Sequence, residues 1–151
     1  MPIHRILVGV DFSEASQQAL DWAIELAARL GATVELLHVY QIPSFAFPES
    51  IVPAPPETLE AMVDEGRRRL EEWAGRVRRA GVAATLEILP GSPYVELVAR
   101  ASEGGFDLVV VGTHGRSGLR HALLGSVAEK VVRRSSVPVL SVRTGDPGPE
   151  T

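Results

Sequence analysis

The chain of 151 residues contains no cysteine. This absence excludes disulfide bonds within the chain, zinc sites built on thiolates and catalysis by a thiol. No apolar run approaches the roughly 20 residues that a membrane-spanning helix needs. Together these absences predict a cytoplasmic protein that does not enter the membrane.

Lysine and asparagine are almost missing as well. A single lysine, Lys130, accompanies fourteen arginines, and there is no asparagine. Heat adaptation and codon usage in a GC-rich genome both produce this bias, and composition alone does not separate them. The formal net charge of −4 argues against a general nucleic-acid binder, because the phosphate backbone selects basic surfaces. We therefore expect no nucleic-acid partner.

Apolar, β-branched runs alternate with segments of helical period along the chain. Strands are predicted at residues 5–10, 32–40, 82–89, 106–112 and 137–143, and helices at residues 13–30, 57–80, 94–102 and 126–134. This βαβαβαβαβ pattern predicts one α/β domain over residues 1–143, with a flexible tail at 144–151. We expect an open, five-stranded, parallel, Rossmann-like sheet with helices on both faces.

Local signals support several of these boundaries. Ser13 is a plausible N-cap and Gly31 stands where a C-terminal glycine belongs. The third helix is expected to turn Val95, Val98 and Ala101 inward. Between the second strand and the second helix, Gln41–Pro56 contains five prolines, so we predict a long exposed loop without regular structure.

Glycines and cations gather after the fourth strand, where parallel sheets bind ligands outside the carboxyl ends of their strands. Residues 108–128 contain no Asp or Glu but include His114, Arg116, Arg120 and His121. Gly125 opens the last helix, whose N–H groups and dipole favour an anion. The segment matches neither the GxGxxG fingerprint nor the GxxxxGK[ST] loop. An anion site and a glycine-rich loop without a ligand both remain open.

Two stretches together resemble the universal stress protein family over nearly the whole chain. "ILVGVDFSEAS" is similar to its first strand and turn, and "VVVGTHGRSGLRHALLGSVAEKVVRRSSVPVLSV" to its C-terminal signature G-x2-G-x9-G-[ST]. The resemblance implies the ATP-binding branch of the family and a sheet of strand order 3-2-1-4-5. It also implies a homodimer formed through the last strand, Val137–Val142. Without a partner, the exposed apolar edge of this strand would promote aggregation.

Carried over residue by residue, the resemblance implies a nucleoside site at the ends of the strands. Val10 and Asp11 would meet the adenine or the ribose, and Val39 would line the adenine pocket. Val111 and Gly112 would lie beside the nucleoside.

The resemblance also implies a phosphate site in the glycine-rich segment. Backbone N–H groups and one hydroxyl would hold the phosphates, from Gly115, Gly125, Ser126 and Val127. Arg116 and Arg120 are not motif positions, and we predict them as phosphate contacts from charge alone. Mg²⁺ could bridge the phosphates, although no carboxylate is obviously placed to hold it.

The resulting hypothesis is a small cytoplasmic ATP-binding regulator in stress response. A slow ATPase or phosphoryl-transfer protein using the same pocket is one alternative, although no catalytic residue is evident. A dimerisation module with a vestigial pocket is another. We interpret His38 as a core histidine, His114 and His121 as solvated loop residues, and the basic run Gly66–Gly81 as a solvated helix face.

Overall fold

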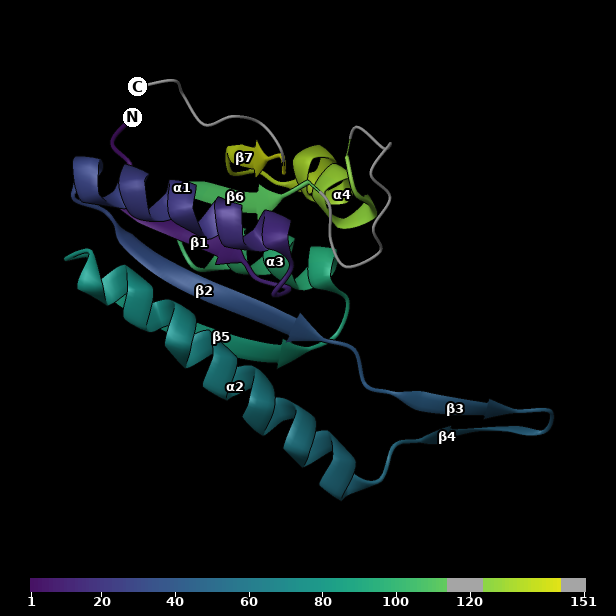
Figure 1. Cartoon of the computed structure of the whole chain (residues 1–151). Helices are drawn as coiled ribbons and strands as arrows, with labels where there is room; N and C mark the ends of the chain where they lie inside the picture. Colours follow the sequence, from purple (N-terminus) through teal and green to yellow (C-terminus); the bar gives the residue numbers. More distant parts are fainter. Residues whose placement is uncertain (114–123, 145–151) are drawn as a thin grey trace.

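The computed structural model describes residues 1–113 and 124–144, and its centre is a five-stranded parallel sheet (Figure 1). The strands are β1 (Arg5–Gly9), β2 (Thr33–Tyr40), β5 (Ala84–Pro90), β6 (Leu108–Gly112) and β7 (Val139–Val142). They lie in the order β5-β2-β1-β6-β7. Counted within this sheet, the order is 3-2-1-4-5, so the predicted fold class and strand order are confirmed.

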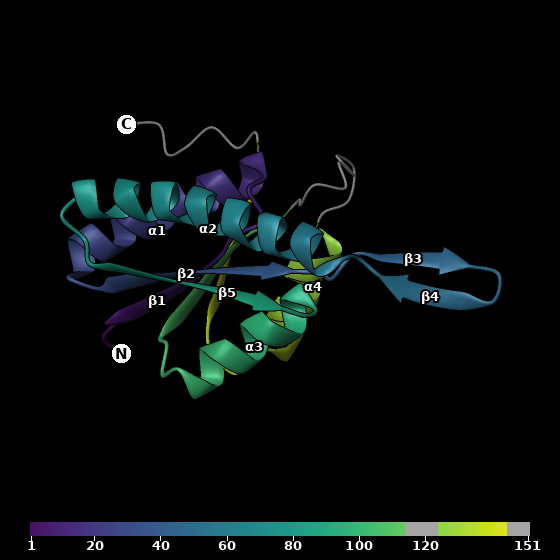
Figure 2. The ribbon, with the colours of Figure 1, turned by 90° about the horizontal axis from the view of Figure 1, so that it is seen from below.

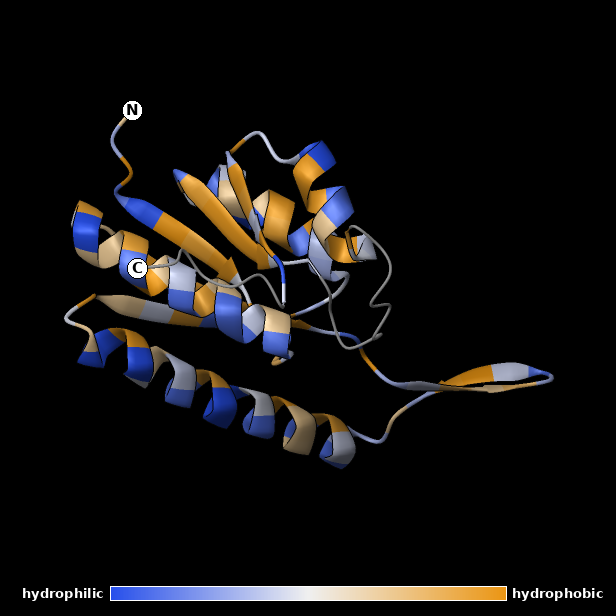
Figure 3. Ribbon diagram, turned by 45° about the horizontal axis from the view of Figure 1, so that its top comes forward, coloured by the Kyte–Doolittle hydropathy of each residue, from blue (hydrophilic) through white to orange (hydrophobic). Residues whose placement is uncertain are grey.

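In the described part of the chain, four helices cover the two faces of the sheet, as Figure 2 illustrates. Helices α1 (Glu14–Leu30) and α2 (Pro56–Arg79) pack on one face, and α3 (Pro93–Glu103) and α4 (Ser126–Arg134) pack on the other. Each face has its own apolar core, with Leu20 and Leu70 in the first and Leu97 and Val131 in the second. The inner strand β6 is apolar throughout and β1 is apolar after Arg5, because both faces of these strands are buried (Figure 3).

The caps of α1 are those predicted. The Ser13 hydroxyl accepts a hydrogen bond from the Ser16 N–H at 3.2 Å, and Gly31 has the left-handed φ of 68°. The inward face of α3 differs from the prediction, because Leu97 and Ala101 are buried whereas Val95 is 45% exposed. Leu97 and Ala101 are four residues apart and therefore lie on the same face of α3, which packs on the sheet. Val95 lies on a different face of the helix.

The prediction of an irregular loop at Gln41–Pro56 is wrong. This segment contains an antiparallel hairpin, β3 (Ser44–Phe47) and β4 (Ser50–Pro53), which projects from the sheet in Figures 1 and 2. The prolines do not prevent it because they lie in the turn, outside the strands or at a strand end. At those positions no N–H is needed for the ladder.

No helix in the described ranges is long and apolar enough to cross a bilayer. The predicted tail lies outside the described residues from residue 145 onward.

Candidate functional site

A cavity of about 640 Å³ lies at the carboxyl ends of β1, β2 and β6. Its size is within the range of small-molecule sites. The chain leaves β1 toward α1 on one face and leaves β6 toward α4 on the other. The two exits therefore diverge, and this divergence opens the crevice in which open α/β sheets bind ligands.

The cavity gathers every predicted site residue that the structure describes. These residues are Val10, Asp11, Val39, Val111, Gly112, Gly125, Ser126 and Val127. Gly115, Arg116 and Arg120 lie outside the described residues, as do His114 and His121.

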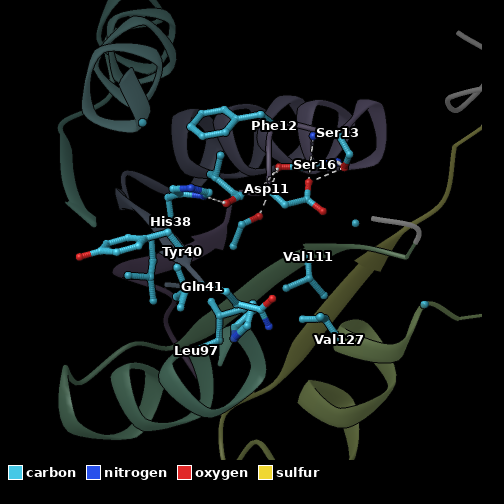
Figure 4. Close-up of a pocket in the computed structure, with 18 of the residues that line it drawn as sticks. Asp11, Phe12, Ser13, Ser16, His38, Tyr40, Gln41, Leu97, Val111 and Val127 are labelled. Carbon is cyan, nitrogen blue, oxygen red and sulfur yellow. Dashed lines mark hydrogen bonds between the residues drawn. The ribbon is translucent and has the colours of Figure 1, made fainter. Parts of the chain in front are cut away.

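Valine side chains from three strand ends form an apolar part of the cavity wall. Val10 and Val111 are each 4% exposed and Val39 is 9% exposed, so their side chains are held by the surrounding core. Figure 4 shows Leu97 and Val127 on the same side of the cavity as Val111. A flat group with large apolar faces can pack against walls of this kind.

The carboxylate of Asp11 is oriented by the turn that follows β1. Its Oδ1 accepts hydrogen bonds from the Ser13 N–H at 2.9 Å and from the Ser13 hydroxyl, while the Asp11 N–H donates to Ser16 Oγ at 3.2 Å (Figure 4). These bonds hold one carboxylate oxygen in the turn and leave Oδ2 outside them. A carboxylate oxygen at a cavity wall can accept a hydrogen bond from a hydroxyl of a ligand.

The N-terminus of α4 forms the opposite end of the cavity. Gly125 is the N-cap residue and has no side chain with which to satisfy the first N–H groups of the helix. The Gly125 N–H donates to the Thr113 carbonyl, which anchors the start of α4 beside the end of β6. Residues 125–128 line the cavity, so this end is chemically suited to an anion.

Gly112 has a packing role that its position in the motif does not reveal. A β-carbon on residue 112 would lie 2.6 Å from the Ala15 carbonyl carbon, so α1 approaches β6 closely only because residue 112 is glycine. Its φ is not in the left-handed region. Close packing against α1, and not a left-handed backbone conformation, therefore accounts for glycine at this strand exit.

Sequence reasoning missed the wall of the cavity on the α2 side. Phe12, His38 and Arg69 line the cavity there, although His38 was assigned to the core and Arg69 to a solvated face. His38 is half-buried, and its Nδ1–H donates to the Val10 carbonyl at 2.7 Å. The spacing of Met62, Gly66 and Arg69 on one helical face was the signal available in the sequence.

No group of three or more acidic or histidine side chains that could hold a metal occurs within residues 1–113 and 124–144. The charged side chains of the described cavity are those of Asp11, Glu65 and Arg69. The hydrogen bond and charge of Arg68 lower the pKa of the Glu65 carboxyl below its ordinary value, with a smaller contribution from Arg69. Glu65 is therefore an anion at neutral pH.

This protein has a parallel sheet with helices on both faces and a cavity where the direction of winding reverses. These features are characteristic of the α/β proteins that bind ligands at this topological switch point. Within that class, sequence similarity identifies the family. The model of the universal stress protein family matches residues 2–143. The chain belongs to this family.

Relatives and solved structures agree with this assignment. Universal stress protein YxiE of Bacillus subtilis is 35% identical over 146 residues, covering 93% of this chain and 99% of the relative. The structure of MJ0577, a protein of Methanocaldococcus jannaschii, superposes with a TM-score of 0.82 at 26% identity, covering 97% of this chain and 99% of that one. A universal stress protein in complex with cAMP has a TM-score of 0.67 at 32% identity, covering 95% of this chain and 99% of that one.

Proposed function

We propose that this protein binds ATP in the cavity at the ends of β1 and β6 and acts as a regulator in stress response. The observation that carries the proposal is the combination of apolar walls, a carboxylate and a helix N-terminus with glycine as its N-cap residue around one cavity. Membership of the universal stress protein family and the complex of a 32% identical member with cAMP support an adenine nucleotide as the ligand.

In this proposal each part of the nucleotide has its own residues. The base lies against Val10, Val39 and Val111, and the ribose hydroxyls donate to Asp11. The phosphates accept hydrogen bonds from the first N–H groups of α4 and from the Ser126 hydroxyl, because the helix dipole favours negative charge there. Gly115, Arg116 and Arg120 stay predicted phosphate contacts.

The same residues are better suited to holding the nucleotide than to cleaving it. The single lysine, Lys130, has its ammonium 4.7 Å from the centre of the Tyr94 ring, where it forms a cation–π contact. It therefore does not serve as the phosphate-binding lysine on which many ATPases depend. We propose binding and release of ATP as the signal, with Mg²⁺ associated with the phosphates.

Calorimetric titration with ATP tests the proposal. We expect saturable binding to the unaltered protein and a loss of roughly tenfold or more, about 1.4 kcal/mol, in Gly125→Val. The φ of −66° at residue 125 permits valine, whose side chain would occupy the mouth of the helix N-terminus. Ser102→Ala is the matched control, because Ser102 bonds to Ala99 on the exposed side of α3. An unaltered protein that shows no heat with ATP contradicts the proposal.

Measurement of ADP release distinguishes a protein that only binds ATP from a slow ATPase. We expect no ADP above the background of a Ser126→Ala variant after incubation for hours. Turnover well above that background would support the alternative that the protein is a slow ATPase.

We also propose a cytoplasmic homodimer that forms through β7. This strand is at one edge of the sheet, and an edge strand is a template for pairing with another chain. Light scattering at micromolar concentration is expected to give the mass of two chains. A monomeric mass contradicts this assembly.

A further inference from the structure

The backbone of Phe12 is unusual within the described chain. Its φ is 63°, and no other non-glycine residue in the described ranges has a positive φ. A bulky side chain disfavours this left-handed conformation, so the surrounding structure must hold it. Phe12 directly follows Asp11 in the turn that lines the cavity.

Three side chains from two other elements hold the Phe12 ring. The His38 ring lies 4.7 Å away, and the Trp73 ring lies 5.4 Å away in an edge-to-face arrangement. The Arg69 guanidinium stacks 4.2 Å from the ring centre. Figure 4 shows Phe12 beside His38, with Asp11 on the cavity side of the turn. The contacts thus join the exit of β1 to β2 and α2.

The φ of Phe12 decides where Ser13 lies relative to Asp11. Rotation about the N–Cα bond of residue 12 moves every following atom of the turn, including both Ser13 donors to Asp11 Oδ1. A φ in the ordinary negative region would carry these donors away from the carboxylate. The orientation of the carboxylate in the cavity therefore depends on the conformation of Phe12.

We propose that Phe12 is a positioning residue that aims the Asp11 carboxylate at the ribose, and that Arg69 stabilises Phe12 in this conformation. The inference rests on the proposed function, because it assigns the hydroxyl groups of a ribonucleotide as the part of the ligand that Asp11 recognises. It adds a determinant of sugar selectivity on the α2 side of the cavity.

Two variants at residue 12 distinguish the effect of the backbone conformation from the effect of losing the aromatic ring. Phe12→Val and Phe12→Gly both remove the ring, but valine disfavours positive φ whereas glycine adopts it freely. Arg69→Gln removes the stacking cation from the surface of α2 and leaves the turn sequence intact. Thermal unfolding checks that each variant folds.

The first readout is the ratio of the affinities for ATP and 2′-deoxy-ATP, measured by calorimetry. A hydrogen bond to a carboxylate predicts a preference of about tenfold for ATP in the unaltered protein. We expect this preference to disappear in Phe12→Val, to persist in part in Phe12→Gly and to fall about two- to fivefold in Arg69→Gln.

The second readout needs no nucleotide. Hydrogen exchange of the Ser13 amide reports its bond to Asp11, and we expect exchange to be about tenfold faster in Phe12→Val than in Phe12→Gly. Equal exchange in these two variants overturns the inference. Equal affinity of the unaltered protein for ATP and 2′-deoxy-ATP also overturns it, because Asp11 then recognises no ribose hydroxyl. If the unaltered protein binds neither nucleotide, the proposed function fails and the amide exchange alone decides the role of Phe12.

Discussion

Gly112 and Ala15 are in such close contact that a β-carbon on residue 112 would lie 2.6 Å from the backbone of Ala15. The contact joins the end of β6 to the first turn of α1. Gly112 and Ser16, which belong to these two elements, line the cavity, so this close approach holds two parts of the cavity wall together.

Gly112→Ala is expected to destabilise the protein by about 1–3 kcal/mol, because α1 must move away from β6 to admit the methyl group. Urea unfolding measures the loss. Gly75→Ala is the control, since a β-carbon there meets only the flexible end of Arg79 at 3.4 Å. Alanine inside helix α2 should be neutral or stabilising by up to about 1 kcal/mol. Equal stability of both variants would show that the contact at residue 112 carries no strain.

The ion pair between Glu35 and Arg100 is expected to stabilise the fold. Glu35 is 6% exposed and accepts two hydrogen bonds from the Arg100 guanidinium, at 2.7 and 2.9 Å. These bonds raise the pKa of Arg100. Arg100→Met would leave the buried carboxylate with only the Thr85 hydroxyl at 3.3 Å and the Arg5 guanidinium at 3.8 Å, and we expect it to cost about 3 kcal/mol in urea unfolding.

Arg133→Met provides the comparison for this ion pair. It removes a pair with Glu129 in which the two side chains are 75% and 46% exposed, so a change within about 0.5 kcal/mol is expected. Replacing Glu35 by Leu together with Arg100→Met should recover part of the lost stability, because no charge is then left buried. A double variant less stable than Arg100→Met would argue against this explanation.

Asp107 is expected to make the stability depend on pH under acidic conditions. Its Oδ2 accepts hydrogen bonds from the backbone N–H groups of His4 at 2.8 Å and Arg5 at 3.0 Å. These bonds lower the pKa of the carboxyl below its ordinary value of 3.8. The contribution is therefore complete above pH 3.8 and is lost as the pH falls through the lower pKa of the folded state.

Asp107→Asn tests this direction of the pH dependence. We expect the variant to be less stable than the unaltered protein at about pH 6, with the difference shrinking as the pH falls toward about 2. Urea unfolding across this range provides the measurement. A difference that grows toward low pH would contradict the assignment of these bonds to the ionised carboxylate.

The hairpin β3–β4 is expected to be dispensable for the folding of the domain. Phe45, Phe47 and Ile51 are each more than half exposed, and an isolated two-stranded hairpin adds little stability. The Ala54 N–H donates to the Pro43 carbonyl at 2.9 Å, so the two ends of the hairpin are already adjacent and a short linker can join them.

Replacing residues 44–53 by a short Gly-Ser linker should therefore change the free energy of unfolding by no more than about 1 kcal/mol. Urea unfolding monitored by circular dichroism measures the change. A loss of several kcal/mol would show that the hairpin contributes to the core.

Much of the fold could be predicted because its determinants are local. The continuous apolar strands, the cap at Ser13 and the left-handed Gly31 depend on residues close together in the chain. The hairpin at Gln41–Pro56 was missed because the number of prolines was weighed without their positions. Val95 was misassigned because a short helix allows two overlapping apolar spacings, and only contact with the sheet selects one.

The sequence by itself determined the alternation of the five sheet strands with the four helices, since the apolar period of each element depends on neighbouring residues. This alternation predicts a parallel sheet, and so it also predicted that the site residues gather at the carboxyl ends of the strands. Tertiary structure alone decided that Gly112 faces Ala15, that Arg69 stacks on Phe12 and that Glu35 pairs with Arg100, 65 residues away. These contacts join segments distant in the chain. Their geometry follows from how helices pack on the sheet, which no local pattern records.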